Sequence, residues 1–327
     1  MKLTTFTSSA IAAVMLTMGM GAANASDSID TSKIHFLIPG GPGGGWDGTA
    51  RGTGEALLKS GMIENASYQN MSGGGGGKAI AYMIETAAKQ TDTLMVNSTP
   101  IVVRSLTKVF PQSFRDLKPV AGTIADYGAF VVRANSKFQN WDEVVAEFKK
   151  NPRKVKFSGG SARGSLDHLV AAMAMQAGDV DVKRLVYVAY DAGGKAMAGL
   201  LSGETAILST GVGEALNMAQ SGEVRILAIT SPKRVEAVPN VPTLTELGYD
   251  VVFANWRGFF AAPSMSDEKV AAYAKLLGGV QGTPEWNEIK ARNGWVNLYN
   301  PDTEFYQFLE NQEQVIGGLM KELGFLR

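Results

Sequence analysis

The sequence predicts an α/β protein of two domains, each built on a parallel sheet. Three observations indicate this fold class. Short β-type runs alternate with amphipathic helical runs along most of the chain, which favours parallel sheets with helices on both faces. The chain has 327 residues, more than a single hydrophobic core usually supports, so two domains are expected. Glycine-rich loops follow several of the predicted strands and lead into helices.

The first 25 residues have the features of a secretory signal peptide. Lys2 precedes an apolar run from about Ala10 to Ala23, and Ala23-Asn-Ala25 matches an A-x-A cleavage site. The alternative is a retained anchor, but the run is shorter than the roughly 20 residues that span a membrane. We expect cleavage of residues 1–25 and a mature protein in the periplasm.

Charge and cysteine content narrow the possible functions. The chain holds 31 Lys and Arg against 31 Asp and Glu, and loss of Lys2 leaves the mature chain at −1. There is no basic excess that would bind nucleic acid, so we expect no nucleic-acid partner. The sequence contains no Cys, which excludes disulfides and the Cys that bacterial lipid anchoring requires. These features predict a freely soluble protein held together by its core.

The strands and helices follow one another at regular intervals. Asn140 is the expected N-cap of a helix over Trp141–Lys150. The candidate strands are Ile34–Pro39, Ser67–Met71, Thr93–Asn97, Val120–Ile124, Ala129–Val132, Val155–Ser158, Leu185–Tyr190, Thr205–Ser209, Val224–Ile229 and Val251–Ala254. Later helical patterns, expected to pack on the first domain, lie at Asp267–Leu277, Pro284–Asn293 and Asp302–Leu323.

The domain boundaries are expected to fall within strands. No long Pro- or Ser-rich linker divides the chain, which favours domains joined by short strand crossings. We expect the chain to pass from the first domain to the second near Gly122–Tyr127 and to return to the first domain near Phe253–Gly258. This predicts a discontinuous first domain of residues 26–124 and 251–327, with residues 125–250 as the second domain.

Three loops share one design: a strand, then glycines or small polar residues, then the start of a helix. They cover Gly40–Asp47, Asn70–Ala79 and Ser158–His168. A helix start presents unpaired N–H groups and a partial positive charge, and glycine lets the backbone approach an anion closely. A flexible turn would explain any single loop. Three loops at equivalent places, where α/β sheets bind ligands, favour an anion-binding cleft.

Motifs for cofactors, metals and catalysis are absent or incomplete. Gly43–Gly48 fits G-x-G-x-x-G, but the next strand does not end in the acidic residue that a dinucleotide ribose needs. Ser72 and Ala79 depart from the phosphate-loop pattern of the second loop. The two His are His35, expected to be structural, and His168, and they form no zinc motif. We therefore expect no metal, no cofactor and no catalytic residue.

Several polar side chains near these loops have more than one interpretation. Asp47 and Arg51 are spaced for an ion pair on a helix surface, and Asp47 is expected to fix the first loop through backbone amides. Ser165 is best interpreted as an N-cap. His168 either orients its loop or contacts the ligand. Arg163 either binds a ligand carboxylate or faces solvent.

The chain contains several short motifs, each occurring once, whose order and spacing are typical of one protein family. They are Pro42-Gly-Gly-Gly-Trp-Asp47 with Ala50-Arg51, Asn70 with Gly73–Gly77, Ser158-Gly-Gly-Ser161 with Gly164-Ser165 and His168-Leu169, Ala189-Tyr-Asp-Ala-Gly-Gly194 with Leu200–Gly203, Val224–Ile229, Val241–Gly248, and Asn255–Gly258 with Ala262-Pro263. Together they cover nearly the whole mature chain and resemble the signatures of the tripartite tricarboxylate transporter receptor family. Trp46 and Arg163 depart from the commonest residues at their places.

The resemblance implies a monomeric solute-binding protein of the type II periplasmic binding protein kind, with two Rossmann-like domains around a cleft. Such a receptor captures a small organic di- or tricarboxylate and delivers it to a permease of two integral membrane subunits. Two alternatives stay open: a receptor for a membrane sensor kinase, and an exported enzyme acting on small carboxylates. Trp46 and Trp256 either stack on an aromatic acid or belong to the wall or core.

The resemblance also implies which residues bind the ligand. The first two glycine loops would hold one carboxylate, and the third and fourth motifs, on the other domain, would meet the distal end. The implied ligand-binding residues are Gly43, Gly44, Gly45, Trp46, Asp47, Gly74, Gly75, Gly76, Asn97, Ser98, Ser158, Ser161, Arg163, Gly164, Ser165, His168, Asp191 and Gly193.

Overall fold

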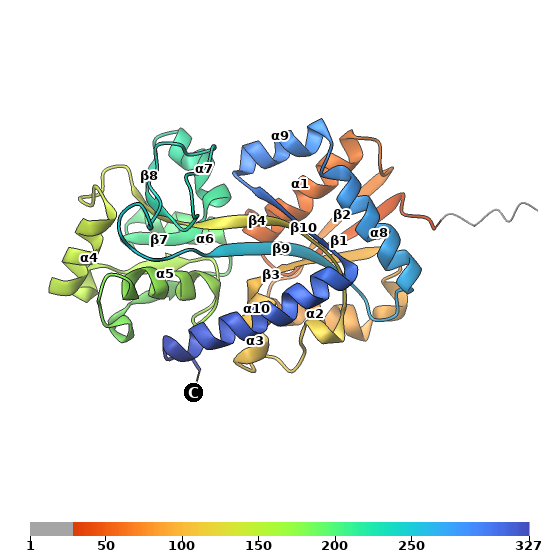
Figure 1. Cartoon of the computed structure of the whole chain (residues 1–327), viewed down its shortest axis with the longest axis horizontal. Helices are drawn as coiled ribbons and strands as arrows, with labels where there is room; N and C mark the ends of the chain where they lie inside the picture. The colour runs from red at the N-terminus through yellow and green to blue at the C-terminus, as the bar shows by residue number, and fades with distance from the viewer. Residues whose placement is uncertain (1–28, 327) are drawn as a thin grey trace, which may run out of the picture.

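The computed structural model describes residues 29–326 and shows two lobes joined by two neighbouring strands (Figure 1). These strands are β4 (Lys118–Arg133) and β9 (Ala254–Ala261), which pair antiparallel where the chain passes between the lobes. The predicted signal peptide, residues 1–25, lies outside the described residues. Among the helices of the described part, none is long and apolar enough to cross a membrane.

The first lobe contains a mixed sheet in the order β2-β1-β3-β9-β4, and β10 pairs with β4 as well. The strands β1, β2 and β3 run parallel, whereas β9 runs antiparallel to both of its neighbours. The further strands of this lobe are β1 (Lys33–Ile38), β2 (Asn65–Asn70), β3 (Thr93–Ser98) and β10 (Val296–Pro301).

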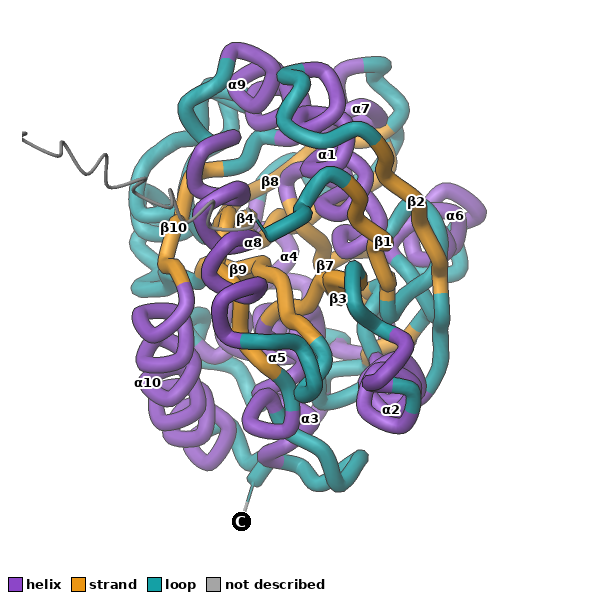
Figure 2. Tube along the Cα trace, turned by 90° about the vertical axis from the view of Figure 1, so that its right-hand side faces the viewer, coloured by secondary structure: helices purple, strands orange, loops and turns teal. Residues whose placement is uncertain are grey.

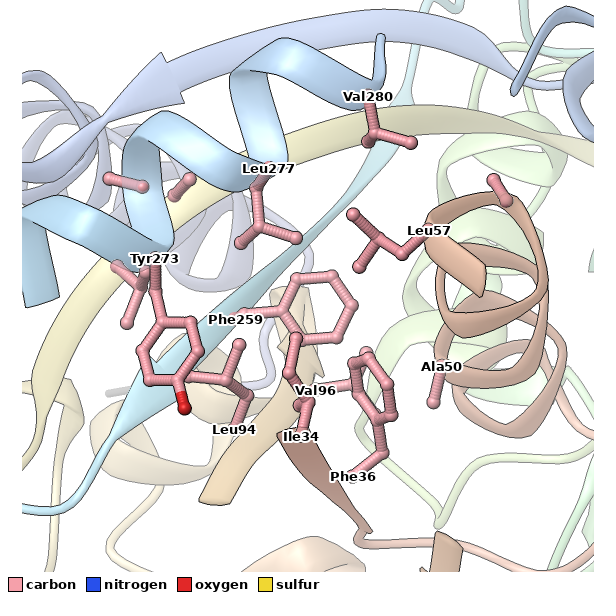
Figure 3. Close-up of a cluster of buried hydrophobic side chains, with 14 of the residues drawn as sticks. Ile34, Phe36, Ala50, Leu57, Leu94, Val96, Phe259, Tyr273, Leu277 and Val280 are labelled. Atoms are coloured by element: carbon pink, nitrogen blue, oxygen red, sulfur yellow. The ribbon is translucent and has the colours of Figure 1, made fainter. Parts of the chain in front are cut away.

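Helices cover both faces of this sheet because successive strand residues point to opposite sides. In β1, Ile34 and Phe36 join one buried cluster, and Leu37 joins the other. Figure 3 shows the first cluster, in which Phe36 and Phe259 lie between α1 and α8; Figure 2 shows α8 in front of β4 and β9. One cluster receives α1 (Gly45–Lys59), α8 (Asp267–Val280) and α9 (Pro284–Asn293), and the other receives α2 (Gly77–Glu85), α3 (Thr99–Leu106) and α10 (Asp302–Glu322).

The second lobe repeats this design on a smaller sheet. The far half of β4 pairs antiparallel with β7 and β8, and β5, β6 and β7 run parallel to one another. The strands are β5 (Phe157–Gly159), β6 (Tyr187–Ala189), β7 (Ile207–Gly211) and β8 (Val224–Ile229). One face is covered by α4 (Trp141–Lys150) and α5 (Leu166–Gln176), the other by α6 (Gly193–Ser202) and α7 (Val212–Gln220).

The predicted fold class is confirmed, with differences where the chain crosses between lobes. Val120–Ile124 and Ala129–Val132, predicted as two strands, are parts of the single strand β4. The run Val251–Ala254 mostly precedes the strand β9, whose remaining residues were not predicted as a strand. The strand β10 was missed as well. The sheets are therefore mixed rather than purely parallel, because the crossing strands run antiparallel to their neighbours.

Candidate ligand-binding site

A cavity of about 140 Å³ lies between the lobes, where their loops meet. The first lobe contributes Gly45 at the start of α1 and Gly76 at the start of α2. The second lobe contributes Ser161 before α5 and Gly193 at the start of α6. Because all four belong to loops that follow parallel strands, the carboxyl ends of both sheets face one space.

The two lobes touch at the rim of this cavity. A Cβ atom placed on Gly41 would lie 3.3 Å from Cβ of Ala192, and one on Gly44 would lie 3.7 Å from the backbone nitrogen of Gly193. Glycine allows this approach because it carries no side chain. The structure is therefore a closed arrangement, in which both lobes surround the cavity.

Asp47 organises the first loop, as its predicted role requires. One carboxylate oxygen accepts a hydrogen bond from Gly43 N–H at 3.1 Å. The other accepts from Arg51 Nε at 2.9 Å and from Asn70 Nδ2 at 3.0 Å. The predicted Asp47–Arg51 ion pair is confirmed. Both oxygens of the Asp47 carboxylate therefore accept hydrogen bonds from groups of the same lobe. The helix start at Gly44, which has no side-chain cap, is left facing the cavity.

Trp46 forms part of the cavity wall. Its Nε1–H donates to Ser98 Oγ at 2.9 Å, and both side chains line the cavity. The bond fixes the indole and leaves the Ser98 hydroxyl proton free to point towards a ligand. Trp256 is instead buried against Phe305, with ring centroids 5.6 Å apart. Of these two Trp residues, only Trp46 lines the cavity.

Arg104, on α3, lines the cavity and was missed by the sequence analysis. Its side chain is 5% exposed, and Nε and Nη2 have no hydrogen-bond partner in the described part of the chain. Removal from solvent lowers the pKa of Arg104 below its ordinary value, although a guanidinium stays charged. An unpaired buried cation costs several kcal/mol, so its position at the cavity wall favours an anionic ligand. The signal in the sequence was one Arg within the apolar helix Thr99–Leu106.

A buried ion pair lies at the crossing strands, beside the cavity. Arg257 Nη2 donates to Asp126 Oδ2 at 2.8 Å, and its Nη1 donates to Thr49 Oγ1 at 3.1 Å. Burial raises the pKa of Asp126 to about 6, against the opposing effect of Arg257. Arg257 also lines the cavity. Arg257 lies in the motif Asn255–Gly258, but its type and spacing predicted no role for it.

The third loop, in the second lobe, is held by its own side chains. Gly164 N–H donates to His168 Nδ1 at 2.9 Å, and the His168 ring stacks on Tyr187 with centroids 4.6 Å apart. Burial lowers the pKa of His168 to about 4, so the ring is neutral and Nδ1 accepts. His168 therefore orients its loop, one of its two predicted roles. Arg163 is exposed and does not line the cavity.

Ser165 occupies the N-cap position of α5, as predicted, but its hydroxyl makes no cap bond. The Oγ atom is buried without a partner among the described residues, and Ser165 lines the cavity. The hydroxyl is thus available to a ligand.

Two carboxyl groups complete the second-lobe wall. Asp167 has its pKa raised to about 7, first by removal from solvent and then by the charge of Glu214, while hydrogen bonds from Ser161 and Gly160 oppose the shift. Glu214 accepts hydrogen bonds from Thr210 Oγ1 at 2.9 Å and from a backbone N–H. Neither Asp167 nor Glu214 was among the residues predicted to bind the ligand.

The structure brings together ten of the predicted ligand-binding residues. Others form hydrogen bonds within their own lobe: Ser158 Oγ bonds with Thr205 Oγ1, and Asn97 Oδ1 accepts a hydrogen bond from Ser98 N–H. Those that line the cavity are Gly44, Gly45, Trp46, Gly75, Gly76, Ser98, Ser161, Ser165, Asp191 and Gly193. Those outside its lining are Gly43, Asp47, Gly74, Asn97, Ser158, Arg163, Gly164 and His168.

No metal site accompanies the cavity in the described residues. Nowhere in residues 29–326 do three or more His, Asp or Glu side chains form a group that could hold a metal ion. The cavity offers backbone amides, hydroxyls, two Arg side chains and carboxyl groups, a set suited to binding a small polar molecule through hydrogen bonds and charge.

Two α/β lobes around a cleft are the fold of solved periplasmic binding proteins. The solved structure of the periplasmic binding protein BugD superposes with a TM-score of 0.80 at 21% identity, covering 89% of this chain and 97% of that one. MatC from Rhodopseudomonas palustris, solved with bound malate, superposes with a TM-score of 0.76 at 18% identity; the match covers 88% of this chain and 98% of MatC. Another R. palustris protein, solved with adipate, superposes with a TM-score of 0.81 at 20% identity; the match covers 89% of this chain and 97% of that one.

Sequence comparison supplies the family. The profile of the tripartite tricarboxylate transporter family receptor matches residues 50–325. BugT of Bordetella pertussis is 29% identical over 314 residues, covering 94% of both chains. A Bordetella bronchiseptica protein is 30% identical over 239 residues, covering 72% of this chain and 69% of its own. The chain belongs to the tripartite tricarboxylate transporter receptor family, as its motifs predicted.

Proposed function

We propose that this protein is a periplasmic receptor that captures a small organic carboxylate, of the di- or tricarboxylate class, and delivers it to a tripartite tricarboxylate transporter. One observation carries the proposal: Arg104 is buried, its Nε and Nη2 have no partner among residues 29–326, and it lines a cavity that two helix starts without side-chain caps also border. A carboxylate placed there would gain the guanidinium and backbone N–H donors together.

The available contacts are sufficient for useful affinity without a metal. A micromolar dissociation constant corresponds to about −8 kcal/mol. A hydrogen bond to a charged group contributes roughly 1.5–3 kcal/mol. About six such bonds would reach this value after the costs of immobilising the ligand and closing the lobes.

Closure would couple binding to delivery. The cavity is complete only when both lobes are in contact, because Gly45 lies on one lobe and Gly193 on the other. A ligand that touches both lobes favours the closed state by its differential affinity. The permease subunits would then distinguish the loaded receptor from the empty one by its shape.

The relatives support this chemistry. MatC was solved with malate and an R. palustris protein with adipate, and both ligands are small carboxylates. The family to which the chain belongs is named for its transporter. We propose that the protein binds its ligand without changing it.

Thermal-shift screening over organic acids tests the binding. A ligand present at 100 times its dissociation constant adds about 2.7 kcal/mol of stability, so one or more small carboxylates should raise the melting temperature clearly. Mass analysis of the ligand after incubation should show it unaltered. Chemical conversion would favour the exported-enzyme alternative, and a screen without a single stabilising acid would contradict carboxylate binding.

Deletion of the gene tests the transport role. Uptake of the labelled acid that binds should fall in the deletion strain and return when the gene is restored. Undiminished uptake, together with loss of a transcriptional response to the acid, would instead support the sensor-kinase alternative.

A further inference from the structure

We propose that the second-lobe end of the cavity binds a protonated amine, so that the ligand is a small acid carrying an ammonium group as well as a carboxylate. This inference rests on the proposed function, because it concerns the ligand of the same cavity. It follows from an asymmetry between the two ends: the first lobe presents hydrogen-bond donors and a cation, and the second lobe presents a larger share of acceptors and carboxyl groups.

The acceptors surround a small niche next to the main cavity. The niche has a volume of about 20 Å³ and shares Asp167, Glu214 and Asn255 with the lining of the main cavity. A space of roughly 10–15 Å³ on this measure holds one water molecule. An ammonium group is of similar size, so the head of an amine fits the niche while the rest of the ligand occupies the cavity.

Two buried oxygen atoms in this region have no partner among the described residues. Asn255 is 9% exposed and its Oδ1 is unpaired, and Ser165 is 1% exposed with Oγ unpaired. Both residues line the main cavity. Buried acceptors without donors cost free energy unless a ligand or water supplies the hydrogen. Asn255 also lines the niche, whereas Ser165 lines the main cavity alone. An ammonium has three N–H donors, enough for Asn255 Oδ1 and the two carboxylates.

The charges at this end are unbalanced. Asp126, Asp167 and Glu214 all line the niche, and the nearby cation Arg257 pairs with Asp126 at 2.8 Å. Within residues 29–326, no Lys, Arg or His side chain forms a salt bridge with the other two carboxyl groups. Burial raises the pKa of both Asp126 and Asp167, and the charge of Glu214 raises it further, which is the effect of like charges that repel. A ligand ammonium would relieve this repulsion, whereas a second ligand carboxylate would add to it.

Most of the second-lobe donors that could hold a distal carboxylate are already occupied. In the third loop, the N–H groups of Gly160 and Ser161 donate to Asp167, and Gly164 N–H donates to His168 at 2.9 Å. Gly211 N–H donates to Glu214 at 3.3 Å. The start of α6 at Gly193 has no side-chain cap, but the Glu214 carboxylate lies directly against it. The second lobe therefore meets most of its anion-binding positions with its own acceptors.

Calorimetric titration with probes matched in carbon number tests the inference. The six-carbon set is adipate, 6-aminohexanoate, 2-aminohexanoate and hexanoate, and the four-carbon set is succinate, 4-aminobutanoate, 2-aminobutanoate and butanoate. In at least one set, an amino acid should bind at least 10-fold more tightly than the dicarboxylate and the plain acid. If, in both sets, the dicarboxylate or the plain acid binds as tightly as the amino acids, the inference is overturned and the proposed function stays intact. If none of the eight compounds binds, the inference is overturned for ligands of these lengths, and the screen over organic acids alone decides the proposed function.

Two isosteric variants assign any preference to these residues. Asp167→Asn and Glu214→Gln should each reduce the preference for the amino acid over the dicarboxylate by about 10-fold, chiefly by weakening the amino acid. Asp250→Asn is the matched control: Asp250 is exposed, lies in the same lobe and does not line the cavity, so the preference should not change. If the melting temperature shows that one of the two variants is unfolded, the ligand preference of the other variant still tests the assignment. Variants that keep the wild-type preference would overturn the assignment.

Discussion

Phe325 packs edge-on against the ring of His168, with ring centroids 4.9 Å apart. The contact joins the lobes, because Phe325 follows α10 of the first lobe and His168 lies in α5 of the second. Leu169 and Ala172 of α5 belong to the same buried cluster as α3 and α10. The closed arrangement is therefore stabilised by apolar packing away from the cavity, and His168 links this packing to the third loop through its bond to Gly164.

Replacing the aromatic ring at this contact should weaken closure. An aromatic pair contributes about 0.5–1.5 kcal/mol beyond its buried area, so Phe325→Ala should weaken ligand binding by roughly 2- to 10-fold, since 1.4 kcal/mol is tenfold. Stopped-flow measurement should assign most of the loss to faster dissociation. Val315→Ala, at a 56% exposed position on α10, should change neither rate. Equal affinities for wild type and Phe325→Ala would show that the contact does not stabilise the loaded state.

Arg104 should contribute to binding without contributing to stability. Arg104→Met removes the charge that faces the cavity, and loss of charged hydrogen bonds of about 1.5–3 kcal/mol should weaken carboxylate binding by roughly 10- to 150-fold. The unliganded variant should be at least as stable as wild type, because an unpaired buried cation is replaced by an apolar side chain of similar size. Calorimetry and urea unfolding measure the two effects. The exposed Arg153 provides the control, Arg153→Met; a loss of stability at position 104 with unchanged affinity would assign Arg104 to structure alone.

The sequence was informative wherever local patterns decide the outcome. The strand β1 alternates between two buried faces, and the spacing of Asp47 and Arg51 predicts their ion pair. The helix over Trp141–Lys150 was predicted with its N-cap, and Asn140 does accept the hydrogen bond from Glu143 N–H at 2.9 Å. These features depend on neighbours within a few residues, so a single sequence contains the necessary information.

Features that depend on distant contacts could not be predicted in the same way. The strand β9 contains Asn255 and Arg257, which are poor strand signals, and it forms because β3 and β4 flank it. A lone Arg in an apolar helix usually extends to the surface, and the burial of Arg104 depends on packing around the cavity. Glu214 reaches the same wall from a helix more than 40 residues beyond the third loop, so its place in the cavity followed only from the fold.

A side chain at Gly41 should prevent the lobes from closing. A Cβ there already lies 3.3 Å from Ala192, so the two additional methyl groups of Gly41→Val would meet the other lobe. We expect ligand affinity to fall at least 10-fold, while the melting temperature of the unliganded protein changes little because each lobe keeps its core. Small-angle scattering should show that ligand no longer compacts the variant. Gly48→Ala is the control, since a Cβ at Gly48 has no atom within 4 Å; normal compaction of Gly41→Val would contradict closure at this rim.

Removing only one charge of the ion pair between Asp126 and Arg257 should destabilise the folded protein strongly. Asp126→Asn leaves Arg257 buried without its charge partner, and such losses are about 3–5 kcal/mol. The double variant Asp126→Asn with Arg257→Met removes both charges and should recover much of that stability. Urea unfolding at pH 7.5, where Asp126 with its pKa of about 6 is ionised, measures the three proteins. A cost below about 1 kcal/mol for Asp126→Asn would mean that water reaches the pair and screens it.

Asp167 should make the protein less stable as the pH rises. Its pKa is about 7 in the folded protein against an ordinary value of 3.8, so between these values the folded state binds more protons than the unfolded state. Stability therefore falls from about pH 4 to pH 7, by up to about 4 kcal/mol at 1.36 kcal/mol per pKa unit. The neighbouring His168, with its pKa lowered to about 4 from 6.5, acts in the opposite sense and loses stability as the pH falls from 6.5.

Asp167→Asn separates these two contributions. The variant lacks the carboxyl group but keeps its shape and acceptor oxygen, while Glu214 and Tyr187, the titratable groups that interact with Asp167, remain in place. Relative to wild type, it should be more stable at pH 8 than at pH 4, by about 1–3 kcal/mol, because the coupling to Glu214 shares the effect between two groups. The remaining influence of His168 should make the variant gain stability between pH 4 and pH 6.5. Urea unfolding across this range gives the comparison, and parallel pH profiles for the two proteins would show that Asp167 titrates normally in the folded state.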